Sequence, residues 1–141
     1  MSKAMITICG CQYHSDAQPE TIELTTEGTL LQSETGWEIA YEESDLTGME
    51  GVQTTFCIEP GQVKLRRTGK LRSEMVFREG VPHESLYQLD FGALLITVCA
   101  RQISASIGPK GGSVDLTYDI EIEQAGTGIV EYHLDVRVME S

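Results

Sequence analysis

Two long stretches near the C-terminal end of the chain alternate apolar and polar residues, and this alternation restricts the fold more than any other feature. From Val114 to Ile122 every second residue is apolar or aromatic, and the residues between them are acidic or threonine. The same period of two runs from Val130 to Val138. Side chains of a β-strand point alternately to its two faces, so this period predicts strands with one buried and one exposed face. No window of the chain shows the i, i+3, i+4, i+7 spacing of an amphipathic helix.

Shorter stretches with the same alternation fill the rest of the chain. We expect strands to begin at Ile6 and to cover residues 22–26, 37–43, 52–58, 63–67, 71–77 and 93–100. Gly28 interrupts the second of them, which predicts a bulge or a bend there. The segments between the strands are short and rich in turn residues, such as Pro60-Gly61 and Thr68-Gly69. Such connections join antiparallel neighbours, because a parallel crossover needs about a dozen residues or more.

Sequential antiparallel strands, each with one apolar face, have to close or stack in order to bury that face. We predict one all-β domain over residues 1–141, an antiparallel up-and-down meander of roughly eight to ten strands closed into a barrel. Closure also removes the unpaired strand edges. A Greek-key sandwich is the alternative, but it requires a long return connection that the sequence does not contain.

The composition excludes several classes of protein. The apolar content of 40% excludes a disordered chain. The longest apolar run, Ala93 to Ala100, is far too short for a membrane helix, which needs about 20 residues. Only four residues precede the first apolar alternation, which leaves no room for a signal peptide, so we expect a cytoplasmic protein. The net charge is −12, and the cations gathered between Lys64 and Arg78 carry few aromatic neighbours. We therefore expect neither nucleic acid nor a membrane as a partner.

The four cysteines are Cys9, Cys11, Cys57 and Cys99. In a reducing compartment we expect them to be free thiols. Cys9, Cys11 and His14 could offer three ligands to zinc, but their spacing is not a recurrent zinc signature and no second pair completes a tetrahedron. We predict no metal and no cofactor.

No catalytic motif is present: the chain has no nucleophile elbow, phosphate loop, dinucleotide fingerprint or zinc-protease helix. The glycines between Gly108 and Gly112 predict a hairpin turn instead. His133 lies between Glu131 and Asp135 on the polar face of the last strand, where a solvated face is expected rather than a catalytic pair. We assign no catalytic residue, and we expect that the protein is not an enzyme.

The predicted inward face carries the candidate binding residues. Val63, Leu65 and Arg67 share one face of their strand, so the alternation turns a guanidinium toward the core. Tyrosines surrounding one cation in a small barrel resemble the interior of intracellular fatty-acid-binding proteins, although a core filled by the tyrosines themselves is an alternative. The candidate interior residues are Arg67, Glu43, Tyr41, Trp37, Phe56, Met75, Phe77, Tyr118 and Tyr132.

Glu43 is a candidate partner for Arg67 on topological grounds. In a meander, the strand that ends at Glu43 and the strand that ends at Arg67 run in the same direction, with one strand between them. Both residues then lie at the same end of the barrel and face inward. We expect a buried ion pair in the resting state, and a ligand carboxylate could replace Glu43. The sequence does not choose between these two roles.

Five segments of the chain, in order, resemble the YwiB-like family of unknown function from Gram-positive bacteria. They are YEES at 41–44, LRRTG at 65–69 followed by SEMVF at 73–77, YQLDFGALLITV at 87–98, and VDLTYDIEI at 114–122. The resemblance covers about Met5 to Val138 and implies a calycin-like barrel, similar to lipocalins. It implies no catalytic residues. Gln88-Leu89-Asp90 departs from the Thr-Pro expected there, which affects the local turn geometry.

Three functions of different class follow from these observations. The first is a ligand-binding or accessory barrel in which Arg67 and the tyrosines bind a small, partly apolar anion. The second is an enzyme that uses Glu43, Arg67 and a tyrosine, and the third is a barrel with a filled core that contacts another protein. Ala93 to Ala100 is apolar on both faces, so its outer face predicts a homodimer.

Overall fold

The computed structural model describes residues 1–14, 18–44, 49–89, 92–123 and 126–139, and it confirms an all-β fold with the strands in a meander. Ten antiparallel strands form one sheet in sequence order, and β1 also pairs with β10. No helix among the described residues is long and apolar enough to span a membrane. The strands are β1 (Ser2–His14), β2 (Glu20–Gln32), β3 (Trp37–Glu42), β4 (Val52–Glu59), β5 (Gln62–Gly69), β6 (Ser73–Phe77), β7 (Pro82–Leu89), β8 (Gly92–Gly108), β9 (Gly111–Ile122) and β10 (Gly126–Val138).

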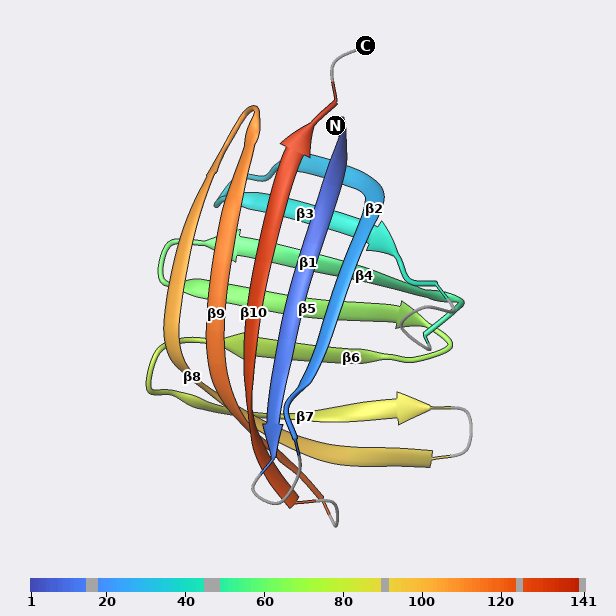
Figure 1. The fold of residues 1–141 in the computed structure, drawn as a ribbon, viewed down its shortest axis with the longest axis vertical. Coiled ribbons are helices and arrows are strands. Elements are labelled where there is room, and N and C mark those ends of the chain that lie inside the picture. Colours follow the sequence, from blue (N-terminus) through green and yellow to red (C-terminus); the bar gives the residue numbers. More distant parts are fainter. Residues whose placement is uncertain (15–17, 45–48, 90–91, 124–125, 140–141) are drawn as a thin grey trace.

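The sheet folds over on itself into two layers whose strands cross at a steep angle (Figure 1). In one layer β1, β9 and β10 run along the long axis, and in the other β3 to β6 cross behind them. The long strands β2 and β8 belong to both layers, because each pairs with different neighbours along its length. This arrangement wraps the apolar face of every strand around one interior.

The barrel is nearly closed, and its weak point lies between β6 and β7. These two strands stand at opposite ends of the sheet order, and isolated bridges connect their ends. Arg72 and Gln88 exchange two backbone hydrogen bonds of 2.9 and 2.8 Å, and the Val81 N–H donates to the Arg78 carbonyl at 3.0 Å. No continuous ladder joins β6 to β7 among the described residues.

The core is built from the residues that the alternation points inward. In β9, for example, Val114, Leu116 and Tyr118 are buried, while Asp115 is exposed. Most of the other strands also turn apolar side chains inward, and their buried residues form one contiguous cluster. Burial of this apolar area is the main stabilising contribution to such a fold.

Two of the differences from the expected strands concern β7 and β8. The segment Pro82–Leu89, for which we predicted no strand, forms β7, and the expected strand at 93–100 continues to Gly108 as β8. β8 is interrupted by a register shift between Ala100 and Gln102. A bulge at this point lets a 17-residue strand bend from one layer into the other.

Gly28 is a close-approach site and not a bulge. The pairing of β2 runs through it without a shift, with Gly28 opposite Ala4 on one side and Tyr41 on the other. A Cβ at this position would lie 2.3 Å from the carbonyl oxygen of Ala40 and 2.4 Å from Cδ1 of Ile6. Only glycine fits at this corner, where β2 passes from β1 to β3.

The apolar strip at 93–100 is less exposed than we expected. Ile96 and Val98 face the core, and the outer face carries Leu95 together with Thr97 and Cys99. Leu95 lies opposite Leu86 of β7, so the outer face carries a patch of two exposed leucines, while the exposed Leu94 lines the interior cavity. The turn geometry expected to change at Asp90 lies outside the described residues.

Candidate ligand-binding site

A row of polar side chains crosses the inner face of the sheet at one end of the barrel. Tyr41 of β3 pairs with Thr54 of β4, Thr54 pairs with Arg67 of β5, and Arg67 pairs with Ser73 of β6. All four residues are buried. The strand alternation therefore places a guanidinium, two hydroxyls and a phenol side by side on one interior surface.

Arg67 is the buried cation of this row. It is 7% exposed, and its Nη1 donates a hydrogen bond of 3.3 Å to the hydroxyl of Tyr87 on β7. Its Nε is buried without a hydrogen-bond partner. Burial by itself lowers the pKa of Arg67, but the surrounding tyrosines outweigh it and the pKa is raised overall. The guanidinium therefore stays charged at neutral pH.

Glu43 follows β3 and its carboxylate also faces the interior. Its Oε2 accepts a hydrogen bond of 2.5 Å from the Thr54 hydroxyl, and its backbone N–H donates to the Val52 carbonyl at 2.8 Å. Glu43 and Arg67 lie at the same end of the barrel with β4 between them, as the topology predicts. The direct pair that we expected is not formed, since none of the ion pairs among the described residues joins them. Thr54, on β4 between β3 and β5, is one donor to the carboxylate.

Tyrosine hydroxyls complete the polar part of the interior. Burial is the main cause that raises the pKa of Tyr41, Tyr118 and Tyr132 above the usual value for a phenol. The charge on Glu43 raises the pKa of Tyr41 further, while Arg67 acts in the opposite direction on all three. These phenols are therefore neutral at physiological pH and can donate hydrogen bonds.

An interior cavity of about 400 Å³ lies against these groups. Arg67, Glu43 and four tyrosines, Tyr41, Tyr87, Tyr118 and Tyr132, form part of its wall. Most of the remaining wall is aliphatic and comes from β1, β2, β8, β9 and β10: Ile8, Ile22, Leu24, Leu94, Ile96, Ile120, Ile122 and Val130. The volume and the mainly apolar lining with a few convergent polar groups are typical of small-molecule sites.

Six of the nine interior residues chosen from the sequence line this cavity, namely Arg67, Glu43, Tyr41, Met75, Tyr118 and Tyr132. The other three lie elsewhere in the core. Phe56 packs on Tyr132 with ring centroids 6.2 Å apart, and Phe77 packs on Tyr118 at 4.6 Å. Trp37 is half-buried and lines a different hollow with Ile58 and Arg78.

Tyr87 is the residue that the sequence did not point out. Its strand turns His83, Ser85 and Tyr87 inward and leaves Leu86 exposed, so the usual relation between polarity and face is reversed. Gln12 and Glu20, also unpredicted, are exposed residues at the mouth of the cavity. The sequence offered one indication of a role for Tyr87, namely that it begins the segment 87–98, which resembles the YwiB-like family.

The described histidine side chains do not form a nucleophile–base pair. His133 is bound on both ring nitrogens by carboxylates, Asp115 at 2.6 Å and Asp135 at 2.9 Å, on the exposed outer face. Its pKa is raised, first by the hydrogen bond to Asp115. His83 Nδ1 accepts a hydrogen bond from the Val76 backbone. In the described part of the chain, no group of three metal-ligating side chains comes together.

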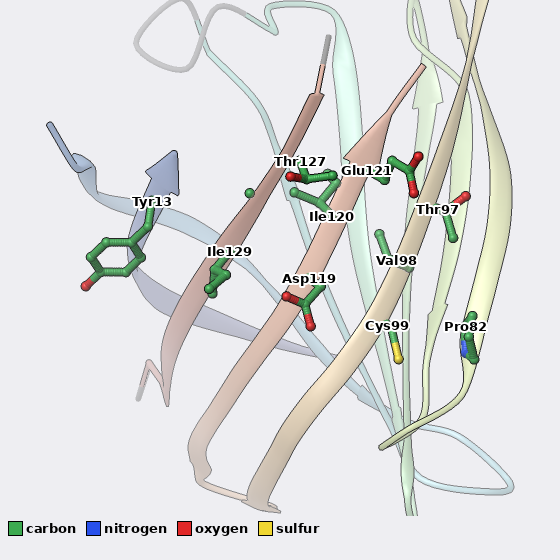
Figure 2. Close-up of a pocket in the computed structure, with 11 residues that line it drawn as sticks. Tyr13, Pro82, Thr97, Val98, Cys99, Asp119, Ile120, Glu121, Thr127 and Ile129 are labelled. Carbon is green, nitrogen blue, oxygen red and sulfur yellow. The ribbon is translucent and has the colours of Figure 1, made fainter. Parts of the chain in front are cut away.

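A groove also crosses the outer surface, and none of the nine candidates lines it. It follows a cross-strand row from Tyr13 of β1 through Ile129, Asp119 and Cys99 to Pro82 of β7 (Figure 2). Its volume is about 550 Å³, but it is open to solvent and contains no buried charge. Asp119, at its centre, already accepts two hydrogen bonds of 2.8 Å from Arg101. The interior cavity is therefore the better candidate site.

Known proteins share this architecture. A sequence model for the domain of unknown function DUF1934 matches residues 6–136. The uncharacterized β-barrel protein YwiB of Bacillus subtilis (strain 168) is 23% identical over 107 residues, covering 76% of this chain and 74% of that protein. The crystal structure of the ywiB protein from Bacillus subtilis matches with a TM-score of 0.88 at 17% identity, covering 99% of this chain and 93% of that chain. These matches confirm the family resemblance of the five sequence segments, and the structural match supports the fold alone.

Proposed function

We propose a ligand-binding function for this chain, which belongs to the DUF1934 family of domains of unknown function. The protein acts without catalysis, as a calycin-like barrel that holds a small, partly apolar anion in its interior. The observation that carries the proposal is a single buried guanidinium, Arg67, in the wall of a mainly aliphatic cavity of about 400 Å³. A carboxylate is the anionic group that fits these donors best.

The polar end of the cavity supplies donors for that carboxylate. Arg67 provides a permanent charge, and the phenol hydroxyls of Tyr87, Tyr118 and Tyr132 lie in the same wall. Hydrogen bonds from a guanidinium to a carboxylate are about twice as strong as neutral ones. Like charges repel, so the ligand's anionic group lies beside Arg67 and away from Glu43.

The aliphatic wall supplies the rest of the binding energy. Residues of β1, β2, β8, β9 and β10 surround the space beyond the polar row. An alkyl chain that leaves water for this space gains about 0.8 kcal/mol per methylene group. The proposal therefore requires that affinity depends on both parts of the ligand, the carboxylate and the chain.

Calorimetric titration with octanoate and octanol tests both requirements. We expect octanoate to bind the wild type more tightly than octanol does. Arg67→Met should weaken octanoate about tenfold or more and leave octanol nearly unchanged. Arg66→Met is the matched control, because Arg66 is the adjacent residue on the outer face and pairs with Glu74 at 3.5 Å.

Two results would overturn the proposal. One is the absence of saturable binding for octanoate and for longer alkanoates alike. The other is an equal loss of octanoate affinity in Arg66→Met and Arg67→Met, which would place the anion on the outer surface. Native mass spectrometry of freshly purified protein identifies any ligand retained from the cell.

A further inference from the structure

The seam between β6 and β7 combines an interrupted backbone ladder with unsatisfied buried donors. Between the bridges at Arg72 and Arg78, the β6 backbone does not pair with β7. Midway along this stretch the Val76 N–H donates 3.3 Å to the side chain of His83 instead of to a carbonyl of β7. A pocket of about 730 Å³ opens there, lined by side chains from both strands and from β5.

Three buried side-chain polar atoms in the described part of the chain have no hydrogen-bond partner: Arg67 Nε, Ser73 Oγ and Ser85 Oγ. All three residues line the seam pocket. Arg67 and Ser73 are cross-strand partners, and Ser85 lies on β7, so the three donors come from both sides of the opening. A buried donor without an acceptor costs about 1–3 kcal/mol, and three of them around one pocket indicate a common acceptor.

The charges around the pocket favour an anion as that acceptor. The pocket is lined by three cations, Arg66, Arg67 and Arg72, and by two carboxylates, Glu74 and Glu84. Glu74 is already engaged by Lys64 at 3.8 Å and by Arg66 at 3.5 Å. The net charge of −12 repels anions at long range, so selectivity has to come from short, buried contacts.

We infer that the β6–β7 seam is a second site, which binds a small oxyanion of the phosphate type through Arg67 Nε and the hydroxyls of Ser73 and Ser85. Arg67 then serves two sites with different atoms: Nη1 donates to Tyr87, and the buried Nε has no other partner. Neither serine lines the interior cavity. The seam site can therefore be tested independently of the proposed carboxylate ligand.

Calorimetric titration with inorganic phosphate, at constant ionic strength in chloride, tests the site. We expect saturable binding by the wild type and about tenfold weaker binding by Ser73→Ala and by Ser85→Ala. Ser104→Ala, at an exposed position of β8, is the matched control and should bind phosphate as the wild type does. Ser85→Ala should bind octanoate unchanged, because Ser85 does not line the interior cavity, and this separates the seam site from the interior one.

A measurement on the wild type covers the case in which a serine variant does not fold. In nitrogen-15 spectra, phosphate should shift the Nε–H resonance of Arg67 and leave unchanged that of Arg101, which donates to Asp119 outside the seam pocket. Octyl phosphate distinguishes the source of the anion: binding tighter than that of inorganic phosphate and weakened by Ser85→Ala indicates the headgroup of an amphiphile, and affinity equal to that of inorganic phosphate indicates the free ion. The inference is overturned if phosphate binds no better than chloride, or if folded Ser73→Ala and Ser85→Ala bind it like the wild type.

Discussion

The hydrogen bond from Thr54 to Glu43 offers a direct test of how the barrel holds a buried carboxylate. Thr54 is fully buried, and its hydroxyl lies 2.5 Å from Glu43 Oε2. Thr54→Val keeps the shape of the side chain and removes only this donor. A hydrogen bond to a charged group contributes about 1.5–3 kcal/mol, so we expect the free energy of unfolding to fall by about 2 kcal/mol.

Two further substitutions separate the hydrogen bond from packing. Thr54→Ser keeps the hydroxyl and loses one methyl group, at a cost of about 1 kcal/mol. Thr55→Val changes the adjacent residue, which points to the other face of β4 and is only half-buried, and should alter stability by less than about 0.5 kcal/mol. Urea denaturation measures all three, and an unchanged m-value ensures that the unfolded state is comparable.

A double-mutant cycle gives the decisive result. If the cost of Thr54→Val comes from the carboxylate, it should nearly disappear in the Glu43→Leu background, with a coupling energy of about 1.5 kcal/mol or more. An equal cost in both backgrounds would refute the reasoning, because the hydroxyl would then act through some other contact.

Three further predictions follow from other parts of the barrel. Gly28→Ala should lower the free energy of unfolding in urea melts by more than about 2 kcal/mol, because the new Cβ would lie 2.3 Å from a backbone oxygen. Gly108→Ala is the control: no atom lies within 4 Å of its Cβ, so the free energy of unfolding should hardly change. The pKa of His133 is raised in the folded state, so protonated His133 stabilises the fold below about pH 6.5 and this stabilisation is lost as the pH rises through the folded pKa. His133→Gln should therefore flatten the decline in the free energy of unfolding from about pH 6 to 8. An unchanged slope would contradict this prediction. The exposed leucine patch predicts a homodimer in sedimentation at micromolar concentration that Leu95→Glu disrupts, and a wild-type monomer would exclude it.

The sequence by itself determined most of the strands and their faces, and β7 is the exception. In β9, β10 and β5 the period of two is regular, and it predicted that Arg67, Tyr118 and Tyr132 point inward. The short connections then predicted antiparallel neighbours in sequence order, which is the observed topology. Both inferences succeed because side-chain direction and hairpin connection are local properties, set by residues close together in the chain.

The tertiary structure decided which inward residues meet. Phe56 and Phe77 face the core as predicted, but they pack on tyrosines and do not line the cavity. Glu43 and Arg67 lie at the same end of the barrel, yet the carboxylate accepts a hydrogen bond from Thr54 and the guanidinium donates one to Tyr87. Tyr87 belongs to the strand that faces β6 across the seam, and this strand turns polar side chains inward. Contacts of this kind depend on the twist and closure of the whole sheet, and no local pattern of residues encodes them.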